Sequence, residues 1–175
     1  QRNIPGTSQR LDRTYRDLIQ QVQAITGVRS ASLAQFTPTS RRGLGGAFDL
    51  PNGRKLQVFA PMIYPDYFAT MGIPVVQGRD FVETDMNENA PPVAVVNESF
   101  ARQAYEGAAA IGKPCVVPTR SRRPCEIIGV VKDSRYGNLR GETQPVVYTL
   151  FNHTPTGRGQ MALHVRVNPG ARAAL

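Results

Sequence analysis

The amino-acid sequence of this chain contains no tryptophan, only two histidines and only two cysteines. It also lacks a run of about 18 apolar residues, the length that a membrane-spanning helix needs. Its richest apolar segments, residues 93–96, 126–131 and 145–151, have the length of strands. Two cysteines are too few for a tetrahedral zinc site, and neither histidine lies near them in the sequence. These absences exclude a membrane span within the chain and a structural zinc site.

No set of catalytic residues is recognisable in the sequence. His153 and His164 do not form a metal-binding pair at helical spacing, so we interpret them as ordinary surface and sheet histidines. No serine lies in a Gly-x-Ser-x-Gly elbow. The glycines of residues 43–46 do not follow a strand and open a helix, as those of a phosphate-binding loop do. The sequence therefore predicts no catalytic residue and no cofactor.

One acidic segment is a candidate metal site. Its spacing lacks the alternating oxygen ligands and the central glycine of a twelve-residue calcium loop. We interpret it as a solvated acidic loop, and the sequence predicts no metal site. The acidic residues of this segment are Asp80, Glu83, Asp85 and Glu88.

The chain is strongly basic, with a formal net charge of +8 and a pI near 10.1. Such a charge is compatible with a polyanion partner. Nucleic-acid-binding proteins usually gather their cations on one element beside aromatic or amide side chains. Here the arginines are spread from Arg2 to Arg172. We therefore predict an arginine-rich solvated surface and no nucleic-acid partner; a position over anionic lipid head groups fits the charge equally well.

Both ends of the sequence resemble cut ends. The first residue is Gln1, and no signal-peptide pattern follows it. At the other end, residues 168–170 have the Asn-Pro-Gly pattern of a helix start, and only about one turn follows. A helix that short is not stable alone. We expect the chain to be part of a longer protein.

Apolar periodicity predicts an α+β fold with many short strands. A helix is expected over residues 8–25, because the apolar residues recur at steps of four and three, and Gly27 can end it. A strand is expected over residues 28–36. Asn-Gly at 52–53 predicts a hairpin between residues 48–50 and 55–60. Further elements are expected as strands at 75–76, 93–96, 126–131, 145–150 and 161–167, and as helices at 66–71 and from 98 to Gly107.

The two cysteines flank a segment that can form a hairpin, residues 116–124. Directly opposed residues of a non-hydrogen-bonded antiparallel pair have Cα atoms about 4.5 Å apart, within the range of a disulfide. We therefore predict a disulfide between Cys115 and Cys125 and an oxidising compartment such as a periplasm. The alternative is a pair of free, buried thiols in a cytosolic protein.

Three segments carry a family resemblance through their order and spacing. The first reads Tyr-Pro-Asp-Tyr-Phe-Ala-Thr-Met-Gly-Ile-Pro at residues 64–74, with Gln-Gly-Arg-Asp-Phe at 77–81. The second reads Val-Ala-Val-Val-Asn-Glu-Ser-Phe-Ala-Arg at 93–102, with Ile-Gly-Lys at 111–113. The third reads Glu-Ile-Ile-Gly-Val-Val-Lys-Asp at 126–133, with Arg-Tyr-Gly at 135–137 and Gln-Pro-Val-Val-Tyr at 144–148. Together they resemble the periplasmic core domain of MacB/FtsX-like ABC-transporter permeases.

The resemblance implies a specific architecture. A porter-like subdomain, a split β-α-β (ferredoxin-like) fold, would comprise residues 1–36 and 161–175 and would be truncated. An inserted mixed α/β subdomain of many short strands would comprise residues 37–160. Two departures from the family pattern stand out. Tyr64 replaces the Ser or Thr that would cap the helix after Pro65, and residues 105–110 differ from the expected acidic, proline-containing loop.

The resemblance also implies a function. The chain would be a non-catalytic extracytoplasmic domain on the periplasmic side of the bacterial inner membrane, transmitting conformational change for export of a substrate. Its partners would be its own transmembrane helices, a cytoplasmic ATPase in a separate domain or subunit, a homodimer partner and a periplasmic adaptor protein. Two alternatives remain: a ligand-sensing or substrate-binding module, which a sizeable apolar pocket would favour, and a basic polyanion-binding domain.

Overall fold

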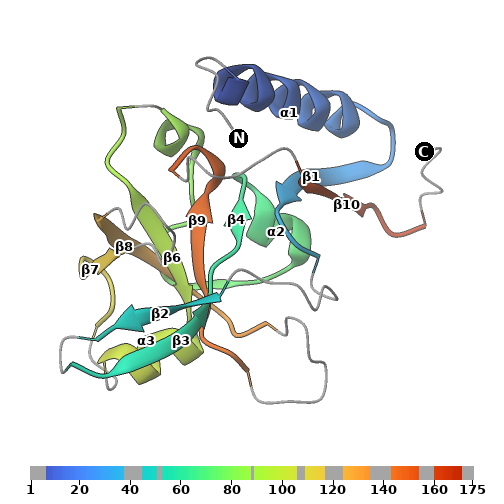
Figure 1. Cartoon of the computed structure of the whole chain (residues 1–175). Helices are drawn as coiled ribbons and strands as arrows, with labels where there is room; N and C mark the ends of the chain where they lie inside the picture. Colours follow the sequence, from blue (N-terminus) through green and yellow to red (C-terminus); the bar gives the residue numbers. More distant parts are fainter. Residues whose placement is uncertain are drawn as a thin grey trace.

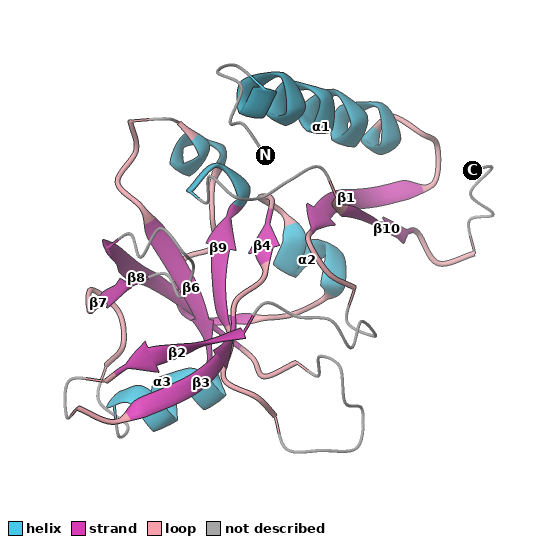
Figure 2. Ribbon diagram, in the orientation of Figure 1, coloured by secondary structure: helices cyan, strands magenta, loops and turns pink. Residues whose placement is uncertain are grey.

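The structure of the chain, a computed structural model, describes residues 7–37, 45–50, 53–87, 89–105, 109–116, 124–134, 143–153 and 160–170. The fold is mixed, with short helices packed around one large sheet (Figures 1 and 2). None of the helices within these residues is both long enough and apolar enough to cross a membrane. The predicted α+β class with many short strands is confirmed.

Helices lie between groups of strands along the chain. The α-helices are α1 (Thr7–Gln23), α2 (Tyr67–Met71) and α3 (Glu98–Tyr105), and the 3-10 helices are η1 (Glu83–Met86) and η2 (Phe151–His153). The strands are β1 (Val28–Ala34), β2 (Gly45–Asp49), β3 (Lys55–Phe59), β4 (Met62–Ile63), β5 (Val75–Gly78), β6 (Val93–Asn97), β7 (Pro114–Val116), β8 (Pro124–Val131), β9 (Val147–Leu150) and β10 (Ala162–Val167).

The main sheet has eight strands in the order β10-β1-β4-β9-β6-β8-β5, with β7 also paired to β8. Most neighbours are antiparallel, but β4 pairs with β9 and β6 pairs with β8 in parallel. Strands β2 and β3 form a separate antiparallel hairpin, as the Asn-Gly signal predicts. Sheet neighbours such as β1 and β10 are thus far apart in the sequence (Figure 1).

Three elements from the two ends of the chain form one unit, which we call the outer unit: α1, β1 and β10. Strands β1 and β10 pair antiparallel from Val28↔Val167 to Ala34↔Ala162. The amide of Asn168 donates to the carbonyl of Gly27, which ties the end of β10 to the turn between α1 and β1. The outer unit lies on the opposite side of the molecule from α3 (Figure 1).

Helix α1 presents one apolar face to the rest of the fold, as its periodicity predicts. Tyr15 and Val22 are buried, and Leu11 and Ile19 pack against the core. Leu18, which the periodicity also places on this face, is 37% exposed. Its side chain falls at the border of the apolar face, because the elements beneath cover only one side of the helix.

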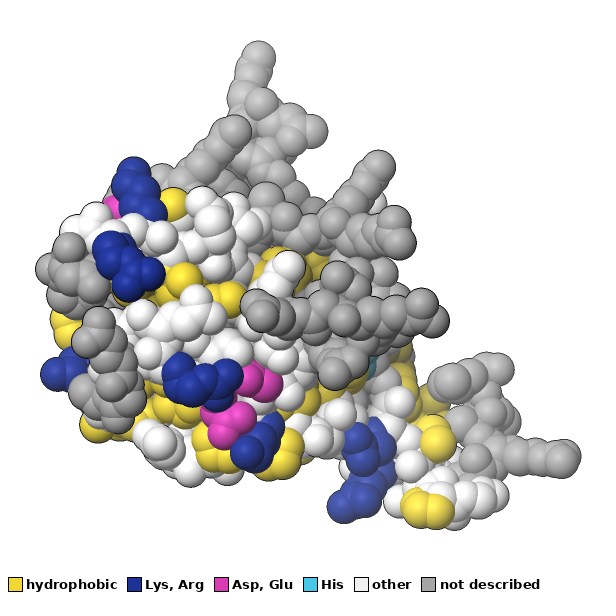
Figure 3. Space-filling model, turned by 90° about the horizontal axis from the view of Figure 1, so that it is seen from below, with side chains coloured by type: hydrophobic (Ala, Val, Ile, Leu, Met, Phe, Trp, Pro, Cys, Tyr) yellow, Lys and Arg dark blue, Asp and Glu magenta, His cyan; other side chains and the backbone are white. Residues whose placement is uncertain are grey.

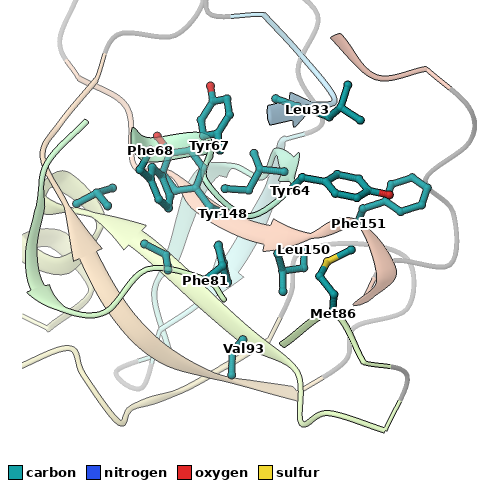
Figure 4. Close-up of a cluster of buried hydrophobic side chains, with 14 of the residues drawn as sticks. Leu33, Tyr64, Tyr67, Phe68, Phe81, Met86, Val93, Tyr148, Leu150 and Phe151 are labelled. Carbon is teal, nitrogen blue, oxygen red and sulfur yellow. The ribbon is translucent and has the colours of Figure 1, made fainter. Parts of the chain in front are cut away.

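Two hydrophobic cores lie on the two faces of the sheet. The larger core is rich in aromatic side chains and includes residues of α1, α2, β9 and η2 (Figure 4). The second lies between the sheet, α3 and the β2–β3 hairpin, with Phe48 and Phe100 in edge-to-face contact at 5.0 Å between ring centroids. Because aromatic pairs of this kind add stability beyond the area they bury, both cores are expected to be stiff.

The helix expected over residues 66–71 begins one residue later. Asp66 has φ 64° and ψ 6°, a left-handed conformation, and no side chain caps the helix. The chain therefore turns sharply at Pro65 and Asp66 before α2 begins at Tyr67. Gly72 ends α2 in the left-handed conformation, as predicted.

Cys115 and Cys125 are opposed in the β7–β8 pair and are joined by a disulfide, with Cα atoms 4.9 Å apart. Both side chains are buried against the second core. The tip of the predicted hairpin, near Arg120, lies outside the described residues.

Candidate functional site

The most distinctive group of contacts is where the outer unit meets β4, α2, η1 and η2; we call it the joint. Its centre is a trio of aromatic rings. Tyr15 of α1 makes edge contacts with Tyr64 at 6.0 Å and with Phe151 at 5.6 Å between ring centroids. Tyr64 and Phe151 stack at 5.5 Å, as Figure 4 shows. Aromatic pairs resist sliding, since they have preferred geometries.

Charged groups border this trio. The Tyr64 hydroxyl donates a hydrogen bond to the Asp12 carboxylate at 2.8 Å. Arg16, one turn further along α1, donates to the same carboxylate at 2.8 Å and also pairs with Glu83 of η1. Burial, and next the hydrogen bond to Asp12, raise the pKa of Tyr64, so its hydroxyl stays a donor at any physiological pH.

Polar contacts also fasten the other side of the outer unit to α2. The Arg166 Nε of β10 donates to the carbonyl of Thr70 at 2.8 Å, in the last turn of α2. A Cβ atom at Gly72 would overlap this guanidinium, so a larger residue there would require the Arg166 side chain to shift. The Ser32 hydroxyl donates to the carbonyl of Pro65 at 2.9 Å. These bonds join β1 and β10 to the segment that the first sequence motif encodes.

An Arg166→Ala variant is expected to lower the free energy of unfolding by about 1–2 kcal/mol, because it leaves the Thr70 carbonyl without its charged donor. Denaturant unfolding followed by circular dichroism measures the change. Arg29→Ala is the matched control: Arg29 is an exposed arginine on the neighbouring strand β1, and its loss should change stability by less than about 0.5 kcal/mol. Equal effects of the two substitutions would contradict this role.

His164 lies inside the joint, between β10 and α2. Its ring contacts Tyr67 edge-on at 5.6 Å, and its buried Nε2 atom has no hydrogen-bond partner among the described residues. Burial lowers the pKa of His164 below its ordinary value. The sheet position predicted for His164 is correct. The side chain of His153 lies outside the described residues.

The acidic segment after β5 is not a solvated loop, so that prediction is wrong for two of its residues. Asp85 is 8% exposed and accepts two hydrogen bonds from Arg79, at 2.7 and 3.0 Å, and one from the amide of Val82 at 2.9 Å. Asp80 is half-buried, and its carboxylate accepts from the amide of Phe81 at 2.6 Å. These bonds hold the segment in the 3-10 helix η1. Glu83 of η1 then forms an ion pair with Arg16 of α1.

The local environment also changes the acidity of Asp80. Burial, opposed by the Phe81 amide and assisted by the charge of Asp66, raises its pKa to about 6. Glu88 lies outside the described residues, and no three potential ligands gather into a metal site within the described part of the chain.

Two groups are expected to change stability in opposite directions as the pH falls. His164 binds a proton less readily in the folded chain, so below its ordinary pKa of 6.5 it lowers the free energy of unfolding. Asp80 binds a proton more readily when folded, so it raises the free energy of unfolding as the pH falls from about 6 towards 3.8.

Substituting each group separately tests this opposition. His164→Gln should leave a chain that gains stability on mild acidification relative to the parent, whereas Asp80→Asn should leave one that loses stability. Urea unfolding at a series of pH values from roughly 7 to 4 measures both slopes. Two variants with the same slope as the parent chain would refute the assignment.

The motifs of the second and third segments pack against each other. Asn97 is fully buried; its Oδ1 accepts from the amides of Phe100 and Val146, and its Nδ2 donates to the carbonyl of Gln144 at 2.9 Å. Asp133 accepts from the amide and hydroxyl of Ser99, both at 2.8 Å, and so caps α3. The motif residues thus hold two strands and a helix together.

Further ion pairs border this cap. Arg102 bonds to Asp133 at 2.9 Å and Lys132 to Glu98 at 3.0 Å. On the face seen from below, basic side chains lie at separate places, some beside acidic ones (Figure 3). Among the described residues, the cations of this face are therefore spread out rather than gathered in one patch.

Sequence reasoning missed the joint because its residues come from distant segments. In the sequence, Tyr64 departs from the family pattern because it replaces a residue that would cap the helix. The structure gives it another role, since its ring and hydroxyl together contact three residues of α1 and η2. The sequence feature that could have indicated this role of Tyr64 is a large aromatic residue next to a short-helix motif. The loop at residues 106–108 lies outside the described residues.

The chain is similar to known proteins in sequence and in structure. The family model for the MacB-like periplasmic core domain matches residues 2–175. The periplasmic region of MacB from Actinobacillus actinomycetemcomitans is similar with a TM-score of 0.63 and 17% identity, covering 90% of this chain and 66% of that one. The extracellular domain of the ABC-type transporter YknZ from Gram-positive bacteria is similar with a TM-score of 0.60 and 16% identity, covering 86% and 71%.

At these identities the structural likeness establishes the fold. The chain spans slightly less than two thirds of the MacB periplasmic region. No curated protein sequence matches it.

Proposed function

Because the chain belongs to the family of MacB-like periplasmic core domains, we propose that it transmits conformational change in an ABC-transporter permease during export of a substrate. It is then a non-catalytic domain on the extracytoplasmic side of the inner membrane. Its partners are its own transmembrane helices, a cytoplasmic ATPase, a second permease subunit and a periplasmic adaptor.

The joint is the observation that supports this proposal most. A domain that transmits movement must be fixed to its moving anchor at more than one place, since one contact would act as a free pivot. Here α1 is fixed through Tyr15, Asp12 and Arg16, and β10 is fixed through Arg166. These contacts lie on both sides of the outer unit, so a rotation of the unit carries the central sheet with it.

The positions of the two described ends also support the proposal. Thr7 begins α1 and Gly170 follows β10, so both ends of the described chain belong to the outer unit (Figure 1). An anchor on each end would therefore pull on the same unit. We further propose the subdomain division implied by the resemblance, with residues 1–36 and 161–175 as the porter-like part and residues 37–160 as the insertion.

The disulfide fits the same location. The Cα atoms of Cys115 and Cys125 are 4.9 Å apart in β7 and β8, within the range of a disulfide. We propose that the bond forms in the oxidising compartment that an extracytoplasmic domain occupies. Thiol alkylation of the protein from cells, followed by mass spectrometry, should find neither cysteine labelled; labelling of both would place the domain in a reducing compartment.

The decisive test weakens the joint without removing a ring. In the full transporter, Tyr64→Phe deletes the hydroxyl that bonds to Asp12 and keeps both aromatic contacts. A hydrogen bond to a carboxylate contributes about 1.5–3 kcal/mol, so we expect substrate exported per ATP hydrolysed to fall several-fold while ATP hydrolysis itself continues.

Tyr105→Phe is the matched control. The Tyr105 hydroxyl makes one long bond, of 3.5 Å, to the carbonyl of Pro114, outside the joint. Its loss should leave export unchanged. If Tyr64→Phe exports as well as the parent, or if both variants fail equally, the joint does not couple movement to export.

A further inference from the structure

The outer unit packs against α2 through a layer of polar side chains, which we call the polar layer. On β10 its members are His164 and Arg166, which face the same side of the sheet because alternate residues of a strand do. Ser32 and Ser30 of β1 are their partners in the ladder. Thr70 of α2 completes the polar layer, since its hydroxyl donates to the Ser30 hydroxyl at 3.1 Å. Helix α2 lies against both strands (Figure 1).

His164 is the member of the polar layer that lacks a hydrogen bond. The hydroxyl groups and the guanidinium of the layer all have hydrogen-bond partners. The buried Nε2 atom of His164 has none among the described residues. An edge contact with Tyr67, at 5.6 Å between ring centroids, holds the ring in place. Within the described part of the chain, His164 is therefore attached to α2 by ring packing.

Protonation makes this position unfavourable for His164. A neutral imidazole has one donor and one acceptor nitrogen, whereas both nitrogens of the protonated ring are donors. The buried Nε2 would then carry an N–H group and part of a positive charge, with no acceptor among the described residues. A buried charge without a partner is costly, so the protonated ring is more stable in water. Burial lowers the pKa of His164 for this reason.

Within the described residues, no charge near the polar layer offsets this cost. Helix α2 contains no charged residue, its Tyr67 is neutral in acid, and Asp66, which precedes it, is exposed. Arg29 of β1 is also exposed, at the irregular step of the ladder with β10. The charge on the same face of β10 is Arg166, which has the same sign as a protonated histidine. Protonation would therefore add repulsion to the loss of hydration.

The sheet itself holds the outer unit weakly. Within the described residues, strands β1 and β4 share one pair, Ala34↔Ile63. So short a ladder resists rotation little, and the side contacts of the joint decide how the outer unit sits. These contacts form two sets, the aromatic trio with α1 and the polar layer with α2. The loss of one set leaves the other as a pivot.

We propose that His164 is an acid-sensitive lock in the joint: protonation of its ring releases β10 from α2, and the outer unit then turns about the aromatic trio. An extracytoplasmic domain meets the acidity of its surroundings, so acid would uncouple the movement of the outer unit from the central sheet. That consequence rests on the proposed function. The release itself does not, because it can be measured on the chain alone.

Two ring contacts of equal length test the lock by NMR. The rings of Tyr67 and His164 are 5.6 Å apart, and so are those of Tyr15 and Phe151 in the aromatic trio. Both pairs should give proton–proton NOEs at about pH 7. As the pH falls to about 4, the NOEs of the first pair should disappear together with the titration of the His164 ring. Those of the second pair should remain.

Uncharged substitutions provide the variants. His164→Phe keeps a ring beside Tyr67, and His164→Gln keeps a polar group; neither can be protonated. In the parent chain, acid should speed the exchange of α2 amides at least about tenfold after correction for the intrinsic rate, and in both variants it should not. His153→Gln, at the other histidine of the chain, is the matched control and should keep the acid response of the parent.

Retained NOEs between Tyr67 and a protonated His164, equal loss of both ring contacts, or an acid response that persists in both His164 variants would each overturn the lock. Export by the full transporter separates this inference from the proposed function. Export per ATP hydrolysed should fall more steeply with acid in the parent than in His164→Gln. If the NOEs show the release but export responds to acid equally in both, the lock stands and the proposed transmission fails.

Discussion

A Gly78→Ala variant is expected to lose about 2–5 kcal/mol of its free energy of unfolding, because the added methyl group meets both backbone strain and steric overlap. Gly78 has φ 67°, a conformation that costs an L-residue about 1–2 kcal/mol. Its Cβ would also overlap the carbonyl oxygen of Ile128. That oxygen belongs to the backbone of β8 and accepts the amide of Arg79, so it cannot move aside without breaking the pair. Overpacking of this kind costs about 1–3 kcal/mol more.

Gly112→Ala separates strain from overlap. Gly112 has φ 76°, nearly the same conformation, but nothing lies within 4 Å of a Cβ built there. It should lose only the strain component, about 1–2 kcal/mol. Thermal and urea unfolding of both variants measures the difference. If the two variants are equally stable, the close approach of β5 to β8 does not constrain the fold.

Asn97→Leu is expected to lower the free energy of unfolding by about 3–5 kcal/mol. The leucine has almost the same size, but it removes three side-chain hydrogen bonds at a fully buried position. The amides of Phe100 and Val146 are then left buried without the oxygen that joined them. Each buried group left unsatisfied costs about 1–3 kcal/mol. The start of α3 and the entry to β9 should loosen together.

Hydrogen exchange localises this effect. Amides of α3 and β9 should exchange faster in Asn97→Leu, while those of α1 and β10 should keep their rates. Asn87→Leu changes an exposed asparagine between η1 and β6 and should be close to neutral. Uniformly faster exchange over the whole chain would mean that Asn97 acts through global stability rather than by joining these two elements.

Local signals predicted the elements well where one covered face dominates. The spacing of Leu11, Tyr15 and Val22 predicts α1, whose observed bounds differ by one or two residues. The Asn-Gly turn predicts the β2–β3 hairpin. The spacing of Cys115 and Cys125 predicts opposed positions, and they are opposed in β7 and β8. Each of these features depends on residues that are close in the sequence.

Long-range arrangement could not be read in the same way. Nothing in the apolar pattern indicates that β9 lies between β4 and β6, or that β4 and β9 run parallel. The hydrogen bond between Tyr64 and Asp12 joins residues 52 positions apart. Asp85 was misjudged for a related reason: acidic residues are usually exposed, and its burial depends on Arg79 turning back towards it.

The family motifs carry structural rather than chemical information. The side chain of Asp133 accepts a hydrogen bond from the amide of Ser99, and the side chain of Asn97 accepts one from the amide of Val146. Gly78 and Gly129 are paired across β5 and β8. Because each of these residues holds two elements together, the motifs are tied to this fold.

The pairing of β1 with β10 has a mechanical consequence. Ala34 and Ala162, the last pair of this ladder, are the points where the chain leaves the outer unit and returns to it. Tension applied through the rest of the molecule would therefore pull the two strands apart from that end and break their hydrogen bonds one after another. A pair of strands resists this direction of force least. The side contacts of Tyr64 with α1 and of Arg166 with α2 bypass this weak direction, because they load both sides of the ladder in parallel.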